Sequence, residues 1–175
     1  MKTRDLVLMA MYTAMFVVLE YISAVVPILQ MPQGGSVSLS GIAIMMAAYF
    51  LGFKKGLVVA VVGVVVTAMF DPITVYHWSQ VFIDYPLAFG GYAFCALVPN
   101  LKVKNLTLQM GVLLGHAIRF MAHNLSGWIF FAEWYPGDVL WGVVLYNATY
   151  MVPTTIVGFI VMTILYPRLK PLAQR

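Results

Sequence analysis

The chain lacks the charged surface of a soluble protein. Only 9% of its 175 residues are Asp, Glu, Lys or Arg, whereas 62% are hydrophobic and the mean hydropathy is +0.91. Soluble domains carry about 25% charged residues. The composition therefore argues against a soluble globular protein and predicts a membrane protein, in a length that allows one domain over residues 1–175.

Cysteines and the common catalytic motifs are also scarce. The single cysteine, Cys95, lies in an apolar run, which excludes an internal disulfide framework. The sequence has no Gly-Lys-Ser/Thr phosphate-binding loop, no HExxH and no GxSxG. ATP hydrolysis by a phosphate-binding loop is therefore excluded. Two histidines seven residues apart make a poor zinc site, so we expect no metal and no cofactor.

Lys and Arg are absent from three segments, residues 27–38, 71–80 and 132–140. Nine of the ten cations fall instead at the two chain ends or near residues 54–55 and 102–104. This is the positive-inside pattern of a multi-span membrane protein. It predicts a multi-pass membrane protein with both termini in the cytoplasm. The net charge of +4 then faces anionic lipid and does not indicate nucleic-acid binding.

The apolar segments predict an all-α membrane protein, a bundle of six transmembrane helices. A span needs about 20 apolar residues, so the short second and third spans rely on interfacial residues or local bilayer thinning. Residues Asn100–Asn105 are expected to form a tight cytoplasmic loop. The predicted spans are Leu6–Leu29, Leu39–Phe53, Gly56–Phe70, Val81–Val98, Leu106–Phe131 and Val139–Leu165.

Acidic and aromatic residues gather on the predicted outer side. The aromatic residues are typical of an interfacial belt. Interleaved carboxylates, imidazoles and aromatic rings also suit a cavity for an organic cation, because ring faces attract cations and a carboxylate supplies the opposite charge. Every acidic residue except Asp5 belongs to this group: Glu20, Asp71, Asp84, Glu133 and Asp138.

Asp84 begins the fourth predicted span in the sequence Asp84-Tyr85-Pro86. A carboxylate that faced lipid at mid-span would cost about 2.5–3.5 kcal/mol. Asp is favoured at helix N-caps, and Pro86 suits a first helical turn. Asp84 is therefore interpreted as a helix cap, as a ligand-binding carboxylate, or as both.

His116, Arg119 and His123 follow a spacing that places them on one face of the fifth predicted helix. This face should point into the bundle, with Arg119 paired to an acid such as Glu20 or Asp84, or to backbone carbonyls. We interpret His116 as a structural residue. A neutral imidazole at His123 offers one donor and one acceptor, which suits a heterocyclic ligand.

Two further polar features accompany this face. Asn147, which follows Tyr146 in the sixth predicted span, must find partners at that depth. It either joins two helices or binds a ligand edge. The glycine-rich segment from Gln33 and Gly34 to Ser36 is not a nucleotide-binding fingerprint, and we interpret it as a gate over the cavity.

Four motifs in this order resemble the thiamine-specific substrate-binding S-component of energy-coupling factor (ECF) transporters, over nearly the whole chain. The resemblance implies a six-helix membrane bundle that captures thiamine (vitamin B1) from outside and is not an enzyme. A separate transmembrane coupling protein and two ATPases would supply the energy. The motifs are Met31-Pro32-Gln33-Gly34-Gly35-Ser36-Val37-Ser38, Asp84-Tyr85-Pro86-Leu87-Ala88-Phe89, His123-Asn124-Leu125-Ser126-Gly127 and Tyr146-Asn147-Ala148-Thr149-Tyr150.

The resemblance also implies roles for single residues. Asp84, with Tyr85 beside it, would balance the thiazolium cation, and His123 and Asn147 would meet the aminopyrimidine. The Asp is shorter than the family's glutamate. Ala10 and Ala14 match the family's AxxxA motif, which docks on the coupling protein; without the resemblance, this pair would indicate only packing inside the bundle.

Two aromatic positions depart from the family pattern. The family's stacking Trp falls on Phe131 here, with Trp134 three residues later, and a family Tyr falls near Trp141 or Gly142. Trp134, Trp141 and Tyr146 are the aromatic residues expected to bind the ligand.

Other functions stay open at this point. The ligand could be another small vitamin or precursor such as hydroxymethylpyrimidine. A different class is an intramembrane lipid-modifying enzyme that uses His116, Arg119, His123 and Asp84. A structural membrane scaffold is a third interpretation.

Overall fold

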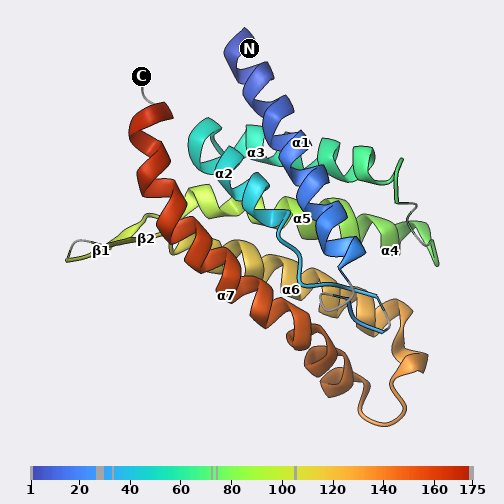
Figure 1. Ribbon diagram of the computed structural model, residues 1–175. Coiled ribbons are helices and arrows are strands. Elements are labelled where there is room, and N and C mark those ends of the chain that lie inside the picture. The colour runs from blue at the N-terminus through green and yellow to red at the C-terminus, as the bar shows by residue number, and fades with distance from the viewer. Residues whose placement is uncertain are drawn as a thin grey trace.

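The computed structural model describes residues 2–26, 30–32, 34–71, 73, 75–104 and 106–173, without the side chains of 172 and 173. It is mostly helical (Figure 1). The α-helices are α1 (Thr3–Val25), α2 (Gly41–Leu51), α3 (Phe53–Thr67), α4 (Trp78–Phe82), α5 (Ala88–Gly90), α6 (Gly111–Phe130) and α7 (Val139–Ala173). A π-helical segment η2 (Ile83–Leu87), two 3₁₀ segments, η3 (Gly91–Leu97) and η4 (Ala132–Trp134), and strands β1 (Leu101–Val103) and β2 (Leu106–Leu108) complete the described elements.

The short helix α2 lies at the centre of the bundle. It contacts α1, α3, η3 and α7. Its residues Ala43–Ala48 are all buried, and most of them are small or unbranched. Small side chains let the neighbouring helices approach closely, so a helix of 11 residues can serve as the core of the bundle.

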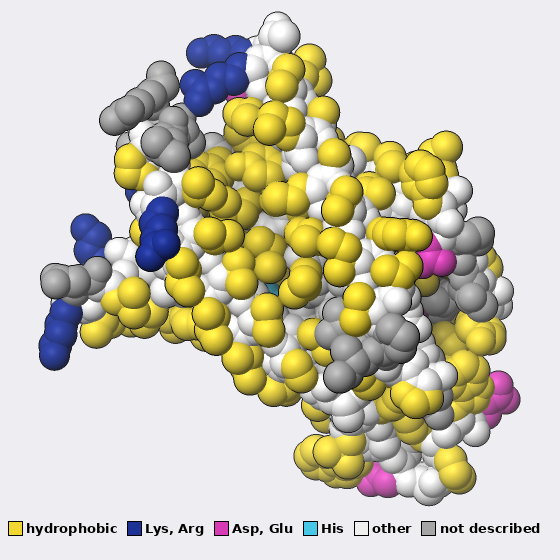
Figure 2. Space-filling view, viewed as in Figure 1, with side chains coloured by type: hydrophobic (Ala, Val, Ile, Leu, Met, Phe, Trp, Pro, Cys, Tyr) yellow, Lys and Arg dark blue, Asp and Glu magenta, His cyan; other side chains and the backbone are white. Residues whose placement is uncertain are grey.

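Charge is divided between the two ends of the molecule. Both termini lie at the same end (Figure 1), and Lys and Arg side chains gather there and on the β1–β2 hairpin (Figure 2). Asp and Glu side chains are visible at the opposite end of the same view (Figure 2). Lys55 Nζ donates to Asp5 Oδ2 at 2.8 Å and joins the starts of α3 and α1, which the sequence placed on one side of the membrane.

The surface is that of a membrane protein. Large apolar side chains are exposed along α1, α3, α6 and α7, for example Val18, Val65 and Ile156. Within the described residues, Thr3–Val25 and Val139–Pro171 are the two helices long and apolar enough by themselves to cross a membrane. The remaining helices are shorter, interrupted or more polar.

The segment after residue 100 differs from the prediction. The expected loop over Asn100–Asn105 and the expected start of a span at Leu106 are wrong. Residues 101–103 and 106–108 form an antiparallel hairpin, in which Leu101 pairs with Leu108. The apolar alternation in Leu106-Thr107-Leu108 belongs to a strand, and α6 begins only at Gly111.

The predicted fourth span is a broken helix. Helical structure starts earlier than expected, at Trp78, and passes through the π segment η2 and the 3₁₀ segment η3. Pro86 lies inside η2. Proline lacks an N–H and so removes one hydrogen bond from a helix interior. Short π segments inside helices are rare and often occur at functional sites.

Gly111 provides a test of the packing between α6 and η3. A Cβ at this position would lie 2.0 Å from the backbone oxygen of Cys95, and backbone cannot move aside as a side chain can. We expect Gly111→Ala to destabilise the purified protein by about 1–3 kcal/mol, as overpacking does. A thermal unfolding series in detergent measures this.

Gly90→Ala is the matched control. Its Cβ would meet only the end of the Leu57 side chain, at 3.0 Å, which can rotate. Equal melting temperatures for the two variants would contradict the close approach at Gly111.

Candidate functional site

A large cavity opens between the helices. Its volume is about 1040 Å³, enough for a vitamin-sized ligand. It is lined by α1, the 30–36 segment, η2, α6, η4 and α7, so every part of the chain that carried a sequence motif contributes to it. Of the expected site residues, Gly34, Asp84, Tyr85, His123, Trp134, Tyr146 and Asn147 line it.

The carboxylate of Asp84 is held by three donors from two helices, α4 and α6. Gln80 Nε2 donates to Oδ2 at 2.8 Å, and the Ser126 hydroxyl donates to the same oxygen at 2.7 Å. His123 Nδ1 donates to Oδ1 at 3.2 Å. These hydrogen bonds fix the direction of the carboxylate, so Asp84 is preoriented at the cavity wall.

The interpretation of Asp84 as a helix cap is wrong. Asp84 lies inside η2, six residues after the start of the helix, and His77 caps α4 by accepting from the Ser79 N–H. Gln80 and Ser126 were missed as site residues. The spacing of Gln80 and Asp84, four apart on a helix, was a usable signal; Ser126 was already part of a quoted motif.

Arg119 is buried on α6, and among the described residues it makes no hydrogen bond to an acid or a backbone carbonyl, contrary to expectation. Its Nε donates to His123 Nε2 at 3.1 Å and its Nη1 to the Tyr92 hydroxyl at 3.1 Å. Its guanidinium carbon lies 4.1 Å from the centre of the Phe89 ring, in cation–π contact. His116 is 2% exposed and its Nδ1 bonds Val112 O at 2.8 Å, so it is the structural residue that was predicted.

Asn147 joins α7 to α6. Its Nδ2 donates to Asn124 Oδ1 at 3.0 Å, and its Oδ1 accepts from the Tyr150 hydroxyl at 2.7 Å. It also lines the cavity. The two interpretations that the sequence left open are therefore compatible, because a primary amide keeps one further N–H and one lone pair.

The 30–36 segment is attached to α7 across the cavity. The Tyr146 hydroxyl donates to Gly34 O at 2.7 Å. Gly35 lies against Tyr150: with φ +84°, it has a conformation that favours glycine, and a Cβ there would meet the ring at 2.8 Å. Gln33, which was expected in the site, lies outside the described residues.

Aromatic rings line much of the cavity. Tyr76, Phe131 and Trp134 form one cluster, with ring centres 5.0–5.9 Å apart. Trp141 is 63% exposed and is not among the lining residues. Burial, with a contribution from Tyr146, raises the pKa of Tyr135 above its ordinary value.

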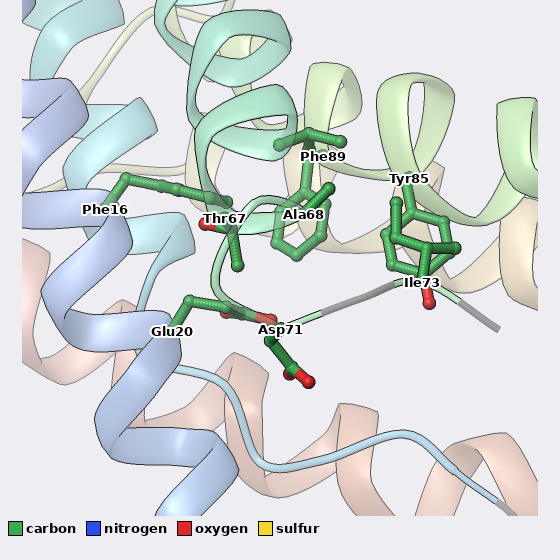
Figure 3. A pocket seen from close by; sticks show the side chains of 9 residues that line it. Phe16, Glu20, Thr67, Ala68, Asp71, Ile73, Tyr85 and Phe89 are labelled. Carbon is green, nitrogen blue, oxygen red and sulfur yellow. The ribbon is translucent and has the colours of Figure 1, made fainter.

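Acidic groups outnumber basic groups at the cavity. Asp84, Glu20 and Asp71 line it together with one cation, Arg119. A side recess of about 70 Å³ shares Glu20 and Asp71 with the main cavity (Figure 3). Glu20 Oε2 also accepts from the Ser38 hydroxyl at 2.8 Å. The excess of carboxylates in a confined space favours a cationic ligand.

Comparison with known proteins identifies the family. The family model described as "Thiamine transporter protein" matches residues 6–174. The chain belongs to the thiamine transporter protein family. It is 35% identical over 179 residues to the thiamine transporter ThiT of Bacillus subtilis (strain 168), a match that covers 94% of this chain and 92% of the relative.

Two solved structures share the fold. One is ThiT from Listeria monocytogenes, with a TM-score of 0.78 and 18% identity over 97% of this chain and 96% of the other. The second is the S component of a bacterial ECF transporter, with a TM-score of 0.65 and 18% identity over the full length of both chains.

These findings confirm the resemblance that the four motifs indicated. They favour a transport subunit over the intramembrane enzyme, because the family and its relatives are named as transporters.

The attachment of the 30–36 segment gives a testable prediction. Tyr146→Phe removes the hydroxyl that bonds Gly34 O, so the segment should open more often while the ring stays in place. We expect faster amide hydrogen exchange in residues 30–36, measured by mass spectrometry without ligand, and a smaller change elsewhere. Tyr21→Phe, on the exposed face of α1, is the control. Unchanged exchange in Tyr146→Phe would contradict the attachment.

Proposed function

We propose that this chain is the thiamine-binding S component of an ECF-type importer and that it captures thiamine from the outer side of the bacterial plasma membrane. Binding needs no covalent chemistry. The chain serves as one domain over residues 1–175, and energy comes from separate subunits. Family membership and the geometry of the cavity support this proposal.

The observation that carries the proposal is the preoriented carboxylate of Asp84 in an aromatic cavity with an excess of acids. Thiamine carries a permanent positive charge on its thiazolium ring. A carboxylate that already has its hydrogen bonds in place needs no reorganisation when the cation arrives, and ring faces add to the attraction. Asp84 is the proposed partner of the thiazolium, with Tyr85 beside it.

The aminopyrimidine is proposed to meet Asn147 and His123. Asn147 keeps one N–H and one lone pair for a heterocyclic edge. Both ring nitrogens of His123 are already bonded, so His123 contacts the ligand through its ring. Trp134 and Tyr146 are proposed to enclose the rings. Trp141 is left out, since it lies exposed on α7.

Topology and partners belong to the same proposal. The common end of the two termini and the cluster of Lys and Arg at that end support cytoplasmic termini. Six spans follow if the short helices α2 and α3 and the broken helix from α4 to η3 cross with the help of interfacial residues. A coupling protein and two ATPases would dock from the membrane and the cytoplasm.

Another vitamin or precursor is the second candidate. Hydroxymethylpyrimidine would satisfy Asn147 but would leave Asp84 without a cation. The excess of acids at the cavity favours thiamine.

The charge of Asp84 is the first thing to test. Asp84→Asn keeps the size of the side chain and removes its charge, so thiamine binding should weaken by about 10- to 100-fold. The measurement is quenching of Trp fluorescence in a thiamine titration of the purified protein. The affinity of the same variant for an uncharged thiamine analogue should fall much less.

Asp138→Asn is the matched control, because Asp138 is exposed in the outer loop and does not line the cavity. No fluorescence change of the native protein at saturating thiamine would refute the proposed ligand. Equal losses for thiamine and the uncharged analogue would refute the role of Asp84.

Docking through α1 is a separate prediction. Ala10 and Ala14 are exposed on α1, where small side chains let a partner helix approach closely. Ala10→Trp and Ala14→Trp should bind thiamine like the native protein but fail to support uptake in cells that contain the energising subunits. Ile156→Trp, a change at an exposed apolar position on α7, should transport normally. Normal uptake by both α1 variants would overturn the docking role.

A further inference from the structure

Arg119 presents a physical problem. It is a buried cation, 5% exposed, that lines a cavity proposed to receive a cation. It would repel the thiazolium, and burying it costs free energy. The contacts of its guanidinium suggest a compensating function.

The bond between Arg119 and His123 determines where the imidazole proton sits. Arginine is a donor only and stays protonated, so Arg119 Nε–H must donate to His123 Nε2, at 3.1 Å. Nε2 is therefore unprotonated. The single proton of the neutral ring must then lie on Nδ1, which donates to Asp84 Oδ1 at 3.2 Å.

We propose that Arg119 is a positioning residue that keeps His123 neutral and so preserves the full negative charge of Asp84 for the thiazolium. This inference rests on the proposed function. A histidine beside a carboxylate would otherwise tend to take a second proton, because the imidazolium is stabilised by the opposite charge. The resulting ion pair would cancel the charge that attracts the ligand.

His123 lies among groups of both charges. Asp84 from η2 and Glu20 from α1 favour a positive imidazole, and Asp71 lines the same cavity. Burial opposes a positive ring, and so does Arg119, which lies on the same helix as His123 and donates to its Nε2. Tyr150 of α7, with its ring centre 6.0 Å away, and Tyr92 of η3, bonded to Arg119, are the neighbouring neutral groups.

The arrangement has a consequence for pH. While Arg119 occupies Nε2, His123 cannot gain a proton without losing that hydrogen bond. Thiamine binding should therefore stay constant as the pH falls from about 8 to about 5.5, across the range in which an ordinary histidine becomes charged.

The first experiment uses the native protein and no ligand. Nitrogen-15 NMR of protein labelled at histidine distinguishes the two neutral tautomers and the imidazolium. His123→Asn identifies the signal of His123 among the three histidines. We expect a neutral ring with its proton on Nδ1 throughout the range from about pH 5.5 to about pH 8. A proton on Nε2, or a doubly protonated ring at neutral pH, would overturn the inference.

The second experiment is a pH profile of thiamine affinity. Arg119→Met removes the donor and keeps an unbranched side chain. Its affinity should approach that of the native protein near pH 8 and fall towards acid, by about tenfold for each pH unit below the imidazole pKa. The double variant Arg119→Met/His123→Asn should lose this acid dependence, whereas Arg119→Lys, which still donates, should restore a flat profile.

A flat profile in folded Arg119→Met protein would show that Arg119 has only a structural role and would overturn the inference. If Arg119→Met does not fold, the NMR result for the native protein decides. Because that result needs no ligand, a protein that fails to bind thiamine but shows the Nδ1 tautomer refutes the proposed function separately from the protonation state.

Discussion

The hydrogen-bonded chain from Arg119 through His123 to Asp84 is the interaction on which the site depends. It places a cation and an anion inside one membrane-embedded bundle and separates them by a single imidazole. Unpaired charges at this depth would be expensive. The hydrogen bonds from Arg119 through His123 to Asp84 lower that cost. They also fix the direction of the carboxylate, because η2 and α6 cannot shift independently while these bonds persist.

The irregular helical segments position the residues of this hydrogen-bonded series. The π segment around Pro86 carries Asp84 and Tyr85 to the cavity wall, and Gln80, one turn earlier, supports the carboxylate. An uninterrupted helix would keep its own backbone bonds but would direct these side chains differently. The broken helix thus places a polar wall inside an apolar bundle.

Charge distribution connects the membrane topology to the ligand. Lys and Arg gather at the end that carries the termini, and acids are found at the cavity end (Figure 2). The first pattern orients a chain during insertion. The second makes the cavity end attractive to a cation. The aromatic cluster of Tyr76, Phe131 and Trp134 lines the same cavity.

The sequence alone determined the membrane class, the family resemblance and one face of α6. These features depend on local patterns: apolar runs, the spacing of His116, Arg119 and His123, and short ordered motifs. Most helix positions followed from the same patterns. The hairpin after residue 100 did not, because a short apolar alternation next to a helix fits either structure.

Tertiary structure decided the partners. No local pattern shows that Arg119 binds Tyr92 in preference to an acid, that Ser126 bonds the carboxylate of Asp84, or that Tyr146 reaches Gly34. Each of the contacts from Arg119 to Tyr92, from Ser126 to Asp84 and from Tyr146 to Gly34 joins residues 27 to 112 positions apart. Such contacts are set by how helices pack against one another, and packing depends on the whole set of side chains and not on any one segment.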